Sequence, residues 1–340
     1  MKRKHLSFIF LILSSLISCS HIESLGTRDF TFQQQPRLVI WFQIAGLSAE
    51  HLPFLKFDNS QQDMSNVVEN MSCQGTLWSH NIYDIRPPIM SRFASQLSGS
   101  PDMVGTCEDL KQNFLWDYAN QIGYKTYILE NEEFADSSFE RYFQCKDQNL
   151  PLTLIKMRKG TPAQDQFHYQ EMKSSISKGV IWDKSCNDKS CFSGWQNNFK
   201  SLIGRVVQGE QKSFILFQDS RFLKLIKEHK IQEAKELFIE FFNQINWIEK
   251  LNLKNVLVMV SGTNSLPVEF PFKGKEWVGY EKKGANIVYH KDSLISPIWA
   301  KGSGSENFCG IYGEEDIVKR LFWTPDEGLF SMSRLKKIFN

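Results

Sequence analysis

Apolar residues along the chain form short continuous runs that alternate with stretches in which they recur at helical spacing. Continuous runs rich in β-branched and aromatic residues predict buried strands at 37–44, 124–129, 213–217, 255–260 and 297–300. Spacings of three and four residues predict helices at 113–122, 231–251 and 314–321. Strands that alternate with helices favour an α/β fold with a mainly parallel central sheet sandwiched by helices. Residues 131–212 are polar and carry several Cys, and we expect an irregular insertion there within a single domain at 37–340.

The first 18 residues have the pattern of a secretory signal. Lys2, Arg3 and Lys4 give a positive start, and an apolar run interrupted by three serines extends from Leu6 to Ile17. This run is too short to span a bilayer stably, since a spanning helix needs about 20 apolar residues. Residues 19–36 are polar, and we expect them to form a tether between the signal and the folded domain.

The signal ends in Leu16-Ile17-Ser18-Cys19, which resembles the lipobox of bacterial lipoproteins. In that family the Cys is diacylated and becomes the first residue of the mature chain. Stable anchoring in a membrane requires two or more acyl chains, which this modification supplies. The resemblance implies a lipid anchor on Cys19 and a domain in the bacterial cell envelope. Ser20, where an Asp would favour the inner membrane, implies the outer membrane and a domain that faces the periplasm. An ordinary cleaved signal with an incidental Cys is the alternative.

The composition bounds the class of protein and its partners. An aromatic share of 13%, with 27 Phe, supplies ample material for a large core. The net charge of +2 gives no electrostatic basis for binding nucleic acid or an anionic membrane face. We therefore expect no nucleic-acid partner, and contact with the membrane only through the N-terminal lipid.

Six cysteines remain when Cys19 is set aside, and an even number in an oxidising compartment favours disulfides. They are Cys73, Cys107, Cys145, Cys186, Cys191 and Cys309. Cys186 and Cys191 flank four residues and are predicted to close a small loop, while the pairing of the other four stays open. The sequence contains no Cys-x-x-Cys pair, so the spacings do not resemble a zinc site.

Several segments resemble, in order, motifs of the alkaline phosphatase superfamily, which includes sulfatases, phosphodiesterases and metal-dependent phosphoglycerate mutases. Leu38 to Leu47 is similar to the family's first strand, which ends in Asp-Gly-Leu, and residues 86–99 are similar to its nucleophile helix. Val256 to Ser261 is similar to the strand that leads into Ser-Asp-His-Gly. Further similarities lie at 114–126 and 297–317. The resemblance implies an alkaline phosphatase-like fold.

The family's reaction uses divalent ions held by carboxylates and imidazoles, which activate a Ser, Thr or modified Cys nucleophile. The resemblance assigns Ala45 to the first metal ligand and Ile89 to the nucleophile. Gly262 and Thr263 take the places of the paired Asp and His ligands. None of the four residues supplies a carboxylate or an imidazole. If the Ser91-Arg92 pair is aligned with the sulfatase Pro-Ser-Arg instead, Pro88 takes the nucleophile position and is also inert.

Two other positions keep a group that can coordinate a metal. Asp219 follows the strand after which a further His is expected, and His290 has about the spacing of the family's last metal-ligand His. A catalytic metal normally has three protein ligands. We therefore expect neither a bound metal nor another cofactor.

The first functional hypothesis is a catalytically inactive sulfatase-like or phosphatase-like lipoprotein with a binding or scaffolding role. Its partner would be an envelope glycan, lipid or protein. Arg92 and Arg221 would clamp an anion such as phosphate or sulfate. The candidate residues of the cleft are Ser91, Arg92, Asp219, Arg221, Asn264 and His290, with Gln43 and Met90 on its rim.

The second hypothesis is a metal-dependent phosphoric or sulfuric ester hydrolase with relocated ligands. Its metal set would be Asp219, Asp84, His80 and His290. A triad of Ser91, His80 and Asp84 is a further alternative, because triads assemble from distant segments. An assembly lipoprotein of another α/β fold also stays open.

Overall fold

Strand β1 (Leu38–Ala45) lies at the centre of the main sheet, and all of its residues are buried. A strand covered on both faces reads as a continuous apolar run, which explains the LVIWFQIA sequence. The computed structural model describes residues 36–56, 67–80, 84–131, 138–145, 150–156, 175–177, 180–182, 195–272 and 274–321. The signal, Cys19 and the tether up to residue 35 lie outside these ranges.

The main sheet has the strand order β12-β2-β11-β8-β1-β7-β3-β4-β6-β5. Strands β8, β1, β7, β3, β4 and β6 run parallel, whereas β11 runs antiparallel to both β8 and β2, and β5 runs antiparallel to β6. Their bounds are β2 (Cys73–Trp78), β3 (Lys125–Asn131), β4 (Leu152–Lys156), β5 (Ser175–Ser177), β6 (Val180–Trp182), β7 (Ser213–Asp219), β8 (Val256–Thr263), β11 (Ile295–Gly302) and β12 (Gly310–Gly313). A separate pair consists of β9 (Val268–Glu269) and β10 (Val288–Tyr289). The prediction of a mainly parallel sheet is therefore confirmed.

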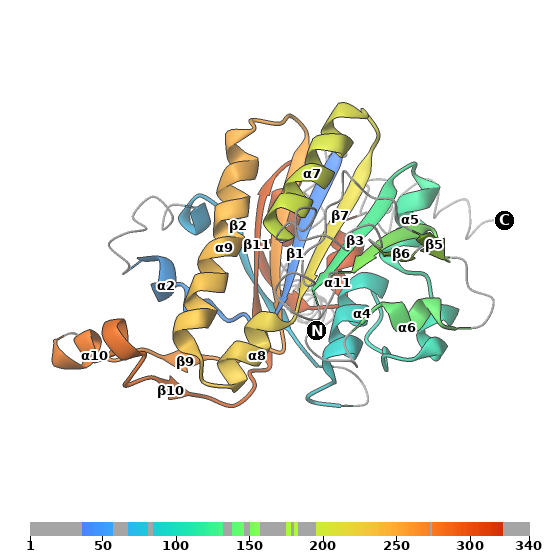
Figure 1. The fold of residues 1–340 in the computed structure, drawn as a ribbon. Helices are drawn as coiled ribbons and strands as arrows, with labels where there is room; N and C mark the ends of the chain where they lie inside the picture. The colour runs from blue at the N-terminus through green and yellow to red at the C-terminus, as the bar shows by residue number, and fades with distance from the viewer. Residues whose placement is uncertain are drawn as a thin grey trace, which may run out of the picture. The chain divides into compact units, whose positions relative to one another are not determined.

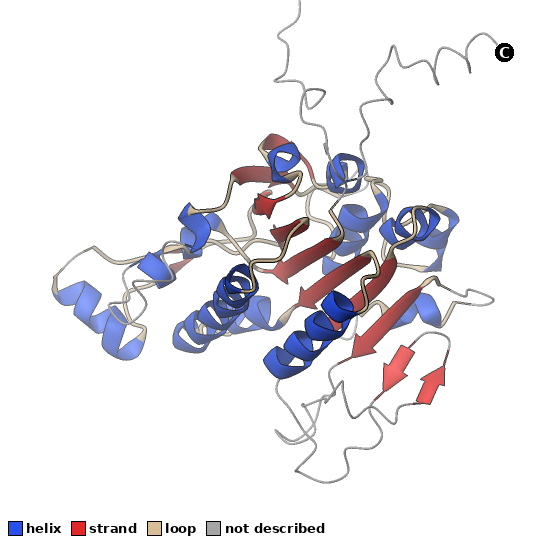
Figure 2. Ribbon diagram, turned by 90° about the horizontal axis from the view of Figure 1, so that it is seen from above, coloured by secondary structure: helices blue, strands red, loops and turns tan. Residues whose placement is uncertain are grey.

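Helices cover both faces of this sheet (Figures 1 and 2). Successive side chains of a strand point to opposite faces. Phe42 packs on Phe199 of α7 (Trp195–Gln208), with ring centroids 5.3 Å apart, whereas Gln43 is directed at Gln96 of α4 (Ile89–Ser98). Helix α9 (Ile231–Lys250) shares the face of α7, and α11 (Asp316–Leu321) packs against α4 on the other.

The remaining short elements complete the described part of the chain. The helices are α2 (Pro53–Lys56), α5 (Leu115–Gln121), α6 (Glu140–Phe143), α8 (Arg221–Lys227) and α10 (Lys275–Lys283). The 3-10 turns are η1 (Ala49–His51), η3 (Cys107–Lys111) and η7 (Ser305–Phe308). The predicted helices at 113–122, 231–251 and 314–321 correspond to α5, α9 and α11.

Part of the expected insertion at 131–212 has regular structure. Within this range β4 pairs with β3 in the main sheet, and α7 covers part of one face. The apolar residues of α7 recur at helical spacing within a polar sequence, at Trp195, Phe199, Leu202, Ile203 and Val206. The polar majority of the segment hid this amphipathic stripe, which is what a surface helix requires.

Two disulfides connect distant parts of the chain. Cys73 bonds to Cys309, with a Cα–Cα distance of 5.1 Å, and Cys107 bonds to Cys145, with a Cα–Cα distance of 5.7 Å. The prediction of disulfides is confirmed for these four residues. Cys186 and Cys191 lie outside the described residues.

Candidate functional site

Four positions that supply neither a carboxylate nor an imidazole lie at one edge of the sheet, where its parallel strands end. They are Ala45, Ile89, Gly262 and Thr263, and we call this edge the carboxyl edge. Ala45 pairs with Thr263, and Ile44 pairs with both Gly262 and Asp219. Asn264 donates a hydrogen bond from Nδ2 to the carbonyl oxygen of Pro87 at 3.4 Å, two residues before Ile89. In open α/β sheets, ligands bind outside the carboxyl ends of the strands. The candidate site is therefore this edge together with the start of α4.

Neutral hydrogen bonds fill the space between α4 and the strands. Gln96 of α4 accepts from Gln43 Nε2 and from Ser261 Oγ through its Oε1, each at 2.9 Å. Gln96 Nε2 in turn donates to the carbonyl oxygen of Gly262 at 3.0 Å, and Trp41 Nε1 donates to Ser261 Oγ at 2.8 Å. All of these side chains are buried. Gln43 Oε1 accepts from no described residue, whereas the other bonds of this network hold the helix against the sheet.

Three buried serines extend this neutral lining along β11 and past the ends of β8 and β2. Ser296 Oγ lies 3.1 Å from Ser79 Oγ and 2.8 Å from Ser265 Oγ, and Ser265 also donates to the carbonyl oxygen of Leu47. A Cβ atom at Gly262 would lie 2.5 Å from that same Leu47 oxygen. The backbone therefore leaves no room for a coordinating side chain at Gly262.

Arg92 and Glu314 are ionisable side chains that are buried beside this lining. Arg92 is fully buried, and its Nε, Nη1 and Nη2 have no hydrogen-bond partner among the described residues. Burial lowers the pKa of Arg92, while Glu314 and Asp292 act against this shift. Burial raises the pKa of Glu314 to about 8, against the opposing effects of Arg92, Gln96 and Ser79. A shift of this size marks a candidate functional residue.

Asp219 and Arg221 form a closed pair instead of an open anion clamp. The Asp219 carboxylate is fully buried and accepts from the backbone nitrogen of Arg221 at 2.8 Å and from its Nη2 at 2.6 Å. The Arg221 guanidinium also lies over the Trp195 ring, 5.7 Å from its centroid. The expected role of Arg221 as an anion ligand therefore needs correction, because its charge is already matched.

His290 lies on the β9–β10 pair, where its nearest charged partner is Glu269. Its Nε2 is 3.5 Å from Glu269 Oε2, and both side chains are at least half exposed. Within the described residues, which include Asp219, Asp84, His80 and His290, no three His, Cys, Asp or Glu side chains are grouped so that they could hold a metal. The relocated metal set is not assembled, and the donors at the carboxyl edge do not fit a catalytic metal ion.

The alternative triad is not assembled either. Ser91 is buried whereas His80 and Asp84 are exposed. No hydrogen bond joins Ser91 to His80 in the part of the chain that the structure describes.

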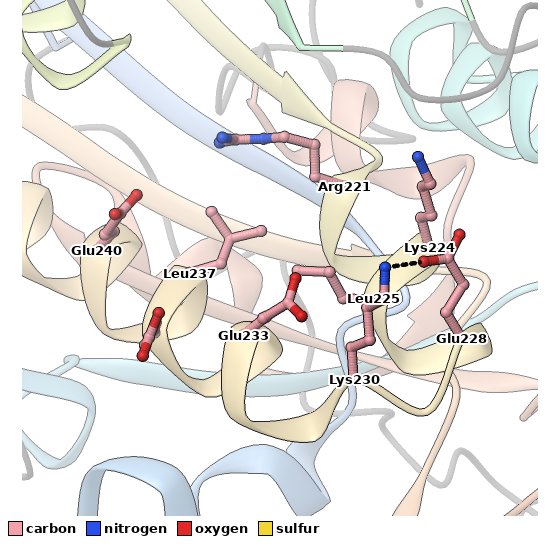
Figure 3. A pocket seen from close by; sticks show the side chains of 9 residues that line it. Arg221, Lys224, Leu225, Glu228, Lys230, Glu233, Leu237 and Glu240 are labelled. Carbon is pink, nitrogen blue, oxygen red and sulfur yellow. Dashed lines mark ion pairs between the residues drawn. The ribbon is translucent and has the colours of Figure 1, made fainter. Parts of the chain in front are cut away.

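A surface groove of about 330 Å³ lies between α8 and α9 (Figure 3). Its lining has both signs of charge, and Lys230 Nζ is 2.8 Å from Glu228 Oε2. Arg221 is one of the residues that line this groove. The charges are mixed, so the groove does not select a ligand by its sign.

The sequence did not single out Gln96, Ser261 or Glu314. Gln96 follows Arg92 by four positions, so the two lie on one face of α4. That spacing could have identified Gln96 from the sequence as a neighbour of Arg92. Glu314 begins the predicted closing helix, and nothing in its neighbourhood in the sequence predicts that it is buried. Among the described helices, none combines the length and the apolar character needed to cross a bilayer.

Comparison with known proteins identifies the fold. No protein-family model and no curated protein matches the sequence. The alkaline phosphatase from the Antarctic bacterium TAB5 is similar in structure, with a TM-score of 0.61 and 13% identity over 85% of this chain and 97% of that one. The Thermus thermophilus alkaline phosphatase has a TM-score of 0.55 and 8% identity, over 94% of this chain and 99% of that one.

A third neighbour is the lipoteichoic acid synthase LtaP from Listeria monocytogenes. Its TM-score is 0.54 and its identity 12%, over 88% of this chain and 74% of that one. At such identities the likeness bears on architecture alone. The chain therefore has an alkaline phosphatase-like α/β fold, as its sequence motifs predict.

Proposed function

We propose that this protein is a lipid-anchored envelope protein that binds an oxyanion at the carboxyl edge of its sheet and does not hydrolyse it. The oxyanion would be the phosphate or sulfate group of an envelope glycan or lipid. The observation that carries the proposal is the buried guanidinium of Arg92, which has no hydrogen-bond partner in the described part of the chain.

A buried charge is costly unless it is paired and hydrogen bonded. Arg92 is fully buried, yet three of its nitrogen atoms donate to no acceptor among the described residues. The guanidinium fork matches two oxygens of a phosphate or sulfate in a bidentate arrangement. The unmet donors therefore favour an oxyanion over a neutral or cationic ligand.

The start of α4 adds to the positive potential around Arg92. Its N-cap residue is Pro88, which provides no side-chain cap. The first turn of a helix has unpaired N–H groups and partial positive charge, and both attract anions. Arg86 also acts on Arg92 with like charge, whereas Glu314 and Asp292 act on it with opposite charge. The helix N-terminus, Arg92 and Arg86 favour an anion over a metal cation.

The proposal of lost hydrolysis rests on the side chains at the carboxyl edge. Ester hydrolysis in this family needs a nucleophile and a Lewis acid. Ala45, Ile89 and Gly262 supply neither, and Asp219 is engaged by Arg221. The neutral network around Gln96 lies between α4 and strands β1 and β8. We infer a binding site in which the substrate-like group is held but not cleaved.

Binding is tested by titrating the mature lipoprotein in detergent with sodium sulfate, and with sodium chloride at equal ionic strength. We expect sulfate to raise the melting temperature of the wild type. Arg92→Met should lose this response, because it removes the unmet donors. Arg205→Met, at an exposed position of α7, is the matched control and should keep it. An Arg92→Met protein that responds like the wild type would refute the binding proposal.

Lost catalysis is tested with generic phosphate and sulfate esters in the presence of Zn²⁺ or Mg²⁺. We expect no turnover above the rate of the buffer with metal. Turnover that disappears when a chelator is added would overturn the proposal in favour of the metal-dependent hydrolase.

Envelope anchoring rests on the lipobox-like end of the signal at Cys19. One structural neighbour is named a lipoteichoic acid synthase, which agrees with a ligand from the cell envelope. Palmitate labelling should mark the wild type in the outer-membrane fraction. Cys19→Ser should abolish the label, because it removes the thiol that is acylated. A wild type without label would contradict the anchor and leave the binding site unaffected.

A further inference from the structure

Glu314 is the acidic side chain that shares the buried environment of Arg92. Its backbone nitrogen donates to the carbonyl oxygen of Trp78 at 3.0 Å, which holds the residue at the end of β2. Its Oε2 accepts from Gln96 Nε2 at 3.4 Å, whereas Oε1 has no partner among the described residues. The carboxyl group is fully buried.

Arg92 and Glu314 lie close enough to interact electrostatically, yet no hydrogen bond joins them among the described residues. Gln96 explains how they meet, because it contacts Glu314 and lies one helical turn after Arg92 on the same face of α4. Each group thus has unused hydrogen-bonding capacity that the other could satisfy. A buried guanidinium can be neutralised by one carboxylate or by one oxyanion.

We propose that Glu314 is an internal counter-ion that competes with the oxyanion ligand for Arg92, so that the ionised carboxylate closes the site and the neutral carboxyl leaves it open. This inference rests on the proposed function, since it assumes that Arg92 receives the ligand. It adds a regulatory role for a residue outside the set expected from the sequence.

The charge balance of the site follows from the groups that face the pair. Glu315 in the same turn as Glu314 disfavours the ionised form, and Arg92 from α4 favours it. Asp292, before β11, and Arg86, before α4, act on Arg92 with opposite signs. With a pKa of about 8, Glu314 is mostly neutral at pH 6.5 and mostly ionised at pH 9. Arg92 therefore gains its internal partner as the pH rises.

The test measures the affinity of the mature lipoprotein for inorganic sulfate between pH 6.5 and pH 9. Sulfate keeps its charge over this range, so a pH effect belongs to the protein. Wild-type affinity should fall by about tenfold from pH 6.5 to pH 9, since one pH unit above the pKa leaves about a tenth of Glu314 neutral. Glu314→Gln should bind sulfate without this decline, because the amide cannot ionise.

Two matched variants decide which acid acts. Glu306→Gln on η7 and Asp292→Asn should both keep the wild-type pH slope. A Glu314→Gln protein with the wild-type slope overturns the counter-ion inference, while loss of sulfate binding in Arg92→Met would still uphold the proposed function. If the pH slope disappears in Asp292→Asn instead, the competing acid is Asp292 and not Glu314, which also overturns the counter-ion inference.

A ligand-free measurement keeps the inference testable if sulfate does not bind. The difference in melting temperature between wild type and Glu314→Gln should change with an inflection near pH 8. In the Arg92→Met background this inflection should move to higher pH, because the favourable charge is gone. An inflection that stays at the same pH shows that the two groups are not coupled.

Discussion

Asn264 joins the end of β8 to the segment before α4 through its hydrogen bond to the Pro87 carbonyl oxygen, 3.4 Å long. The residue has a φ of +48°, in the left-handed region that non-glycine residues other than Asn and Asp rarely adopt. Its Oδ1 also accepts from Thr263 Oγ1 at 3.3 Å. This side chain therefore adds one further connection between β8 and the segment that leads into the helix of Arg92.

Replacement of Asn264 separates backbone conformation from hydrogen bonding. Asn264→Ala should lower the free energy of unfolding by about 2 kcal/mol, because it loses the bond and places alanine, which tolerates the left-handed region less well than asparagine, at this position. Asn264→Gly should cost less, since glycine adopts this conformation without strain. Urea denaturation measures both values. Equal losses in the two variants would show that the left-handed backbone contributes nothing.

A second prediction concerns His51, which is buried among Phe54, Phe222 and Phe238. Its Nδ1 accepts from the backbone nitrogen of Ser48 at 3.0 Å, and burial lowers its pKa from 6.5 to about 3. The unfolded chain therefore binds a proton below pH 6.5 that the folded protein excludes. The contribution of His51 to stability is complete above pH 6.5 and falls as the pH drops toward 3.

The expected loss is about 2 kcal/mol between pH 6.5 and pH 5, at about 1.4 kcal/mol per pH unit. His51→Gln should be less stable at pH 7 and should show a shallower decline in acid. His290→Gln, at an exposed site, serves as the control and should keep the wild-type slope. Denaturation curves from pH 5 to pH 7 measure these slopes, and identical curves for His51→Gln and wild type would contradict the prediction.

The central strands could be predicted because their physical cause is local. β1 and β8 are continuous apolar runs, and a strand covered on both faces needs such a run. The polar lining could not be predicted, because Gln96 meets Ser261 and Glu314 across 165 and 218 positions of sequence. A polar residue in a sequence does not identify its partner. Only the fold brings these side chains together.

Several residues expected in the cleft have different surroundings in the structure, for the same reason. The identity of Arg221 suggested an anion ligand, but its guanidinium forms an ion pair with Asp219, two positions earlier. His290 had the spacing of a ligand, yet it directly follows β10 of the separate β9–β10 pair, where it lies beside Glu269. Arg92 was expected at the cleft from its motif. Its burial, with no hydrogen-bond partner among the described residues, depends on the fold and could not be derived from the motif.

A third prediction concerns the two disulfides, which close loops of very different length. Cys107 and Cys145 are 38 positions apart, and Cys73 and Cys309 are 236 apart. In the loop-entropy account, removing the shorter link costs about 4 kcal/mol and removing the longer one somewhat more, about 5 kcal/mol. Paired Cys→Ser variants tested by urea denaturation should show this order. A larger loss for the shorter link would indicate that native packing, and not the unfolded chain, sets the effect.

The last prediction uses the pair of Asp219 and Arg221 to separate structural from ligand-binding arginines. Arg221→Met leaves a fully buried carboxylate without its guanidinium partner and should cost about 3 kcal/mol of stability. Adding Asp219→Asn should recover part of this loss, because the amide carries no charge. A double-mutant cycle by urea denaturation measures the coupling. The Arg221→Met protein should still bind sulfate, whereas Arg92→Met should not. If Arg221→Met lost sulfate binding while it remained folded, the ligand would have to lie nearer to β7 than to the start of α4.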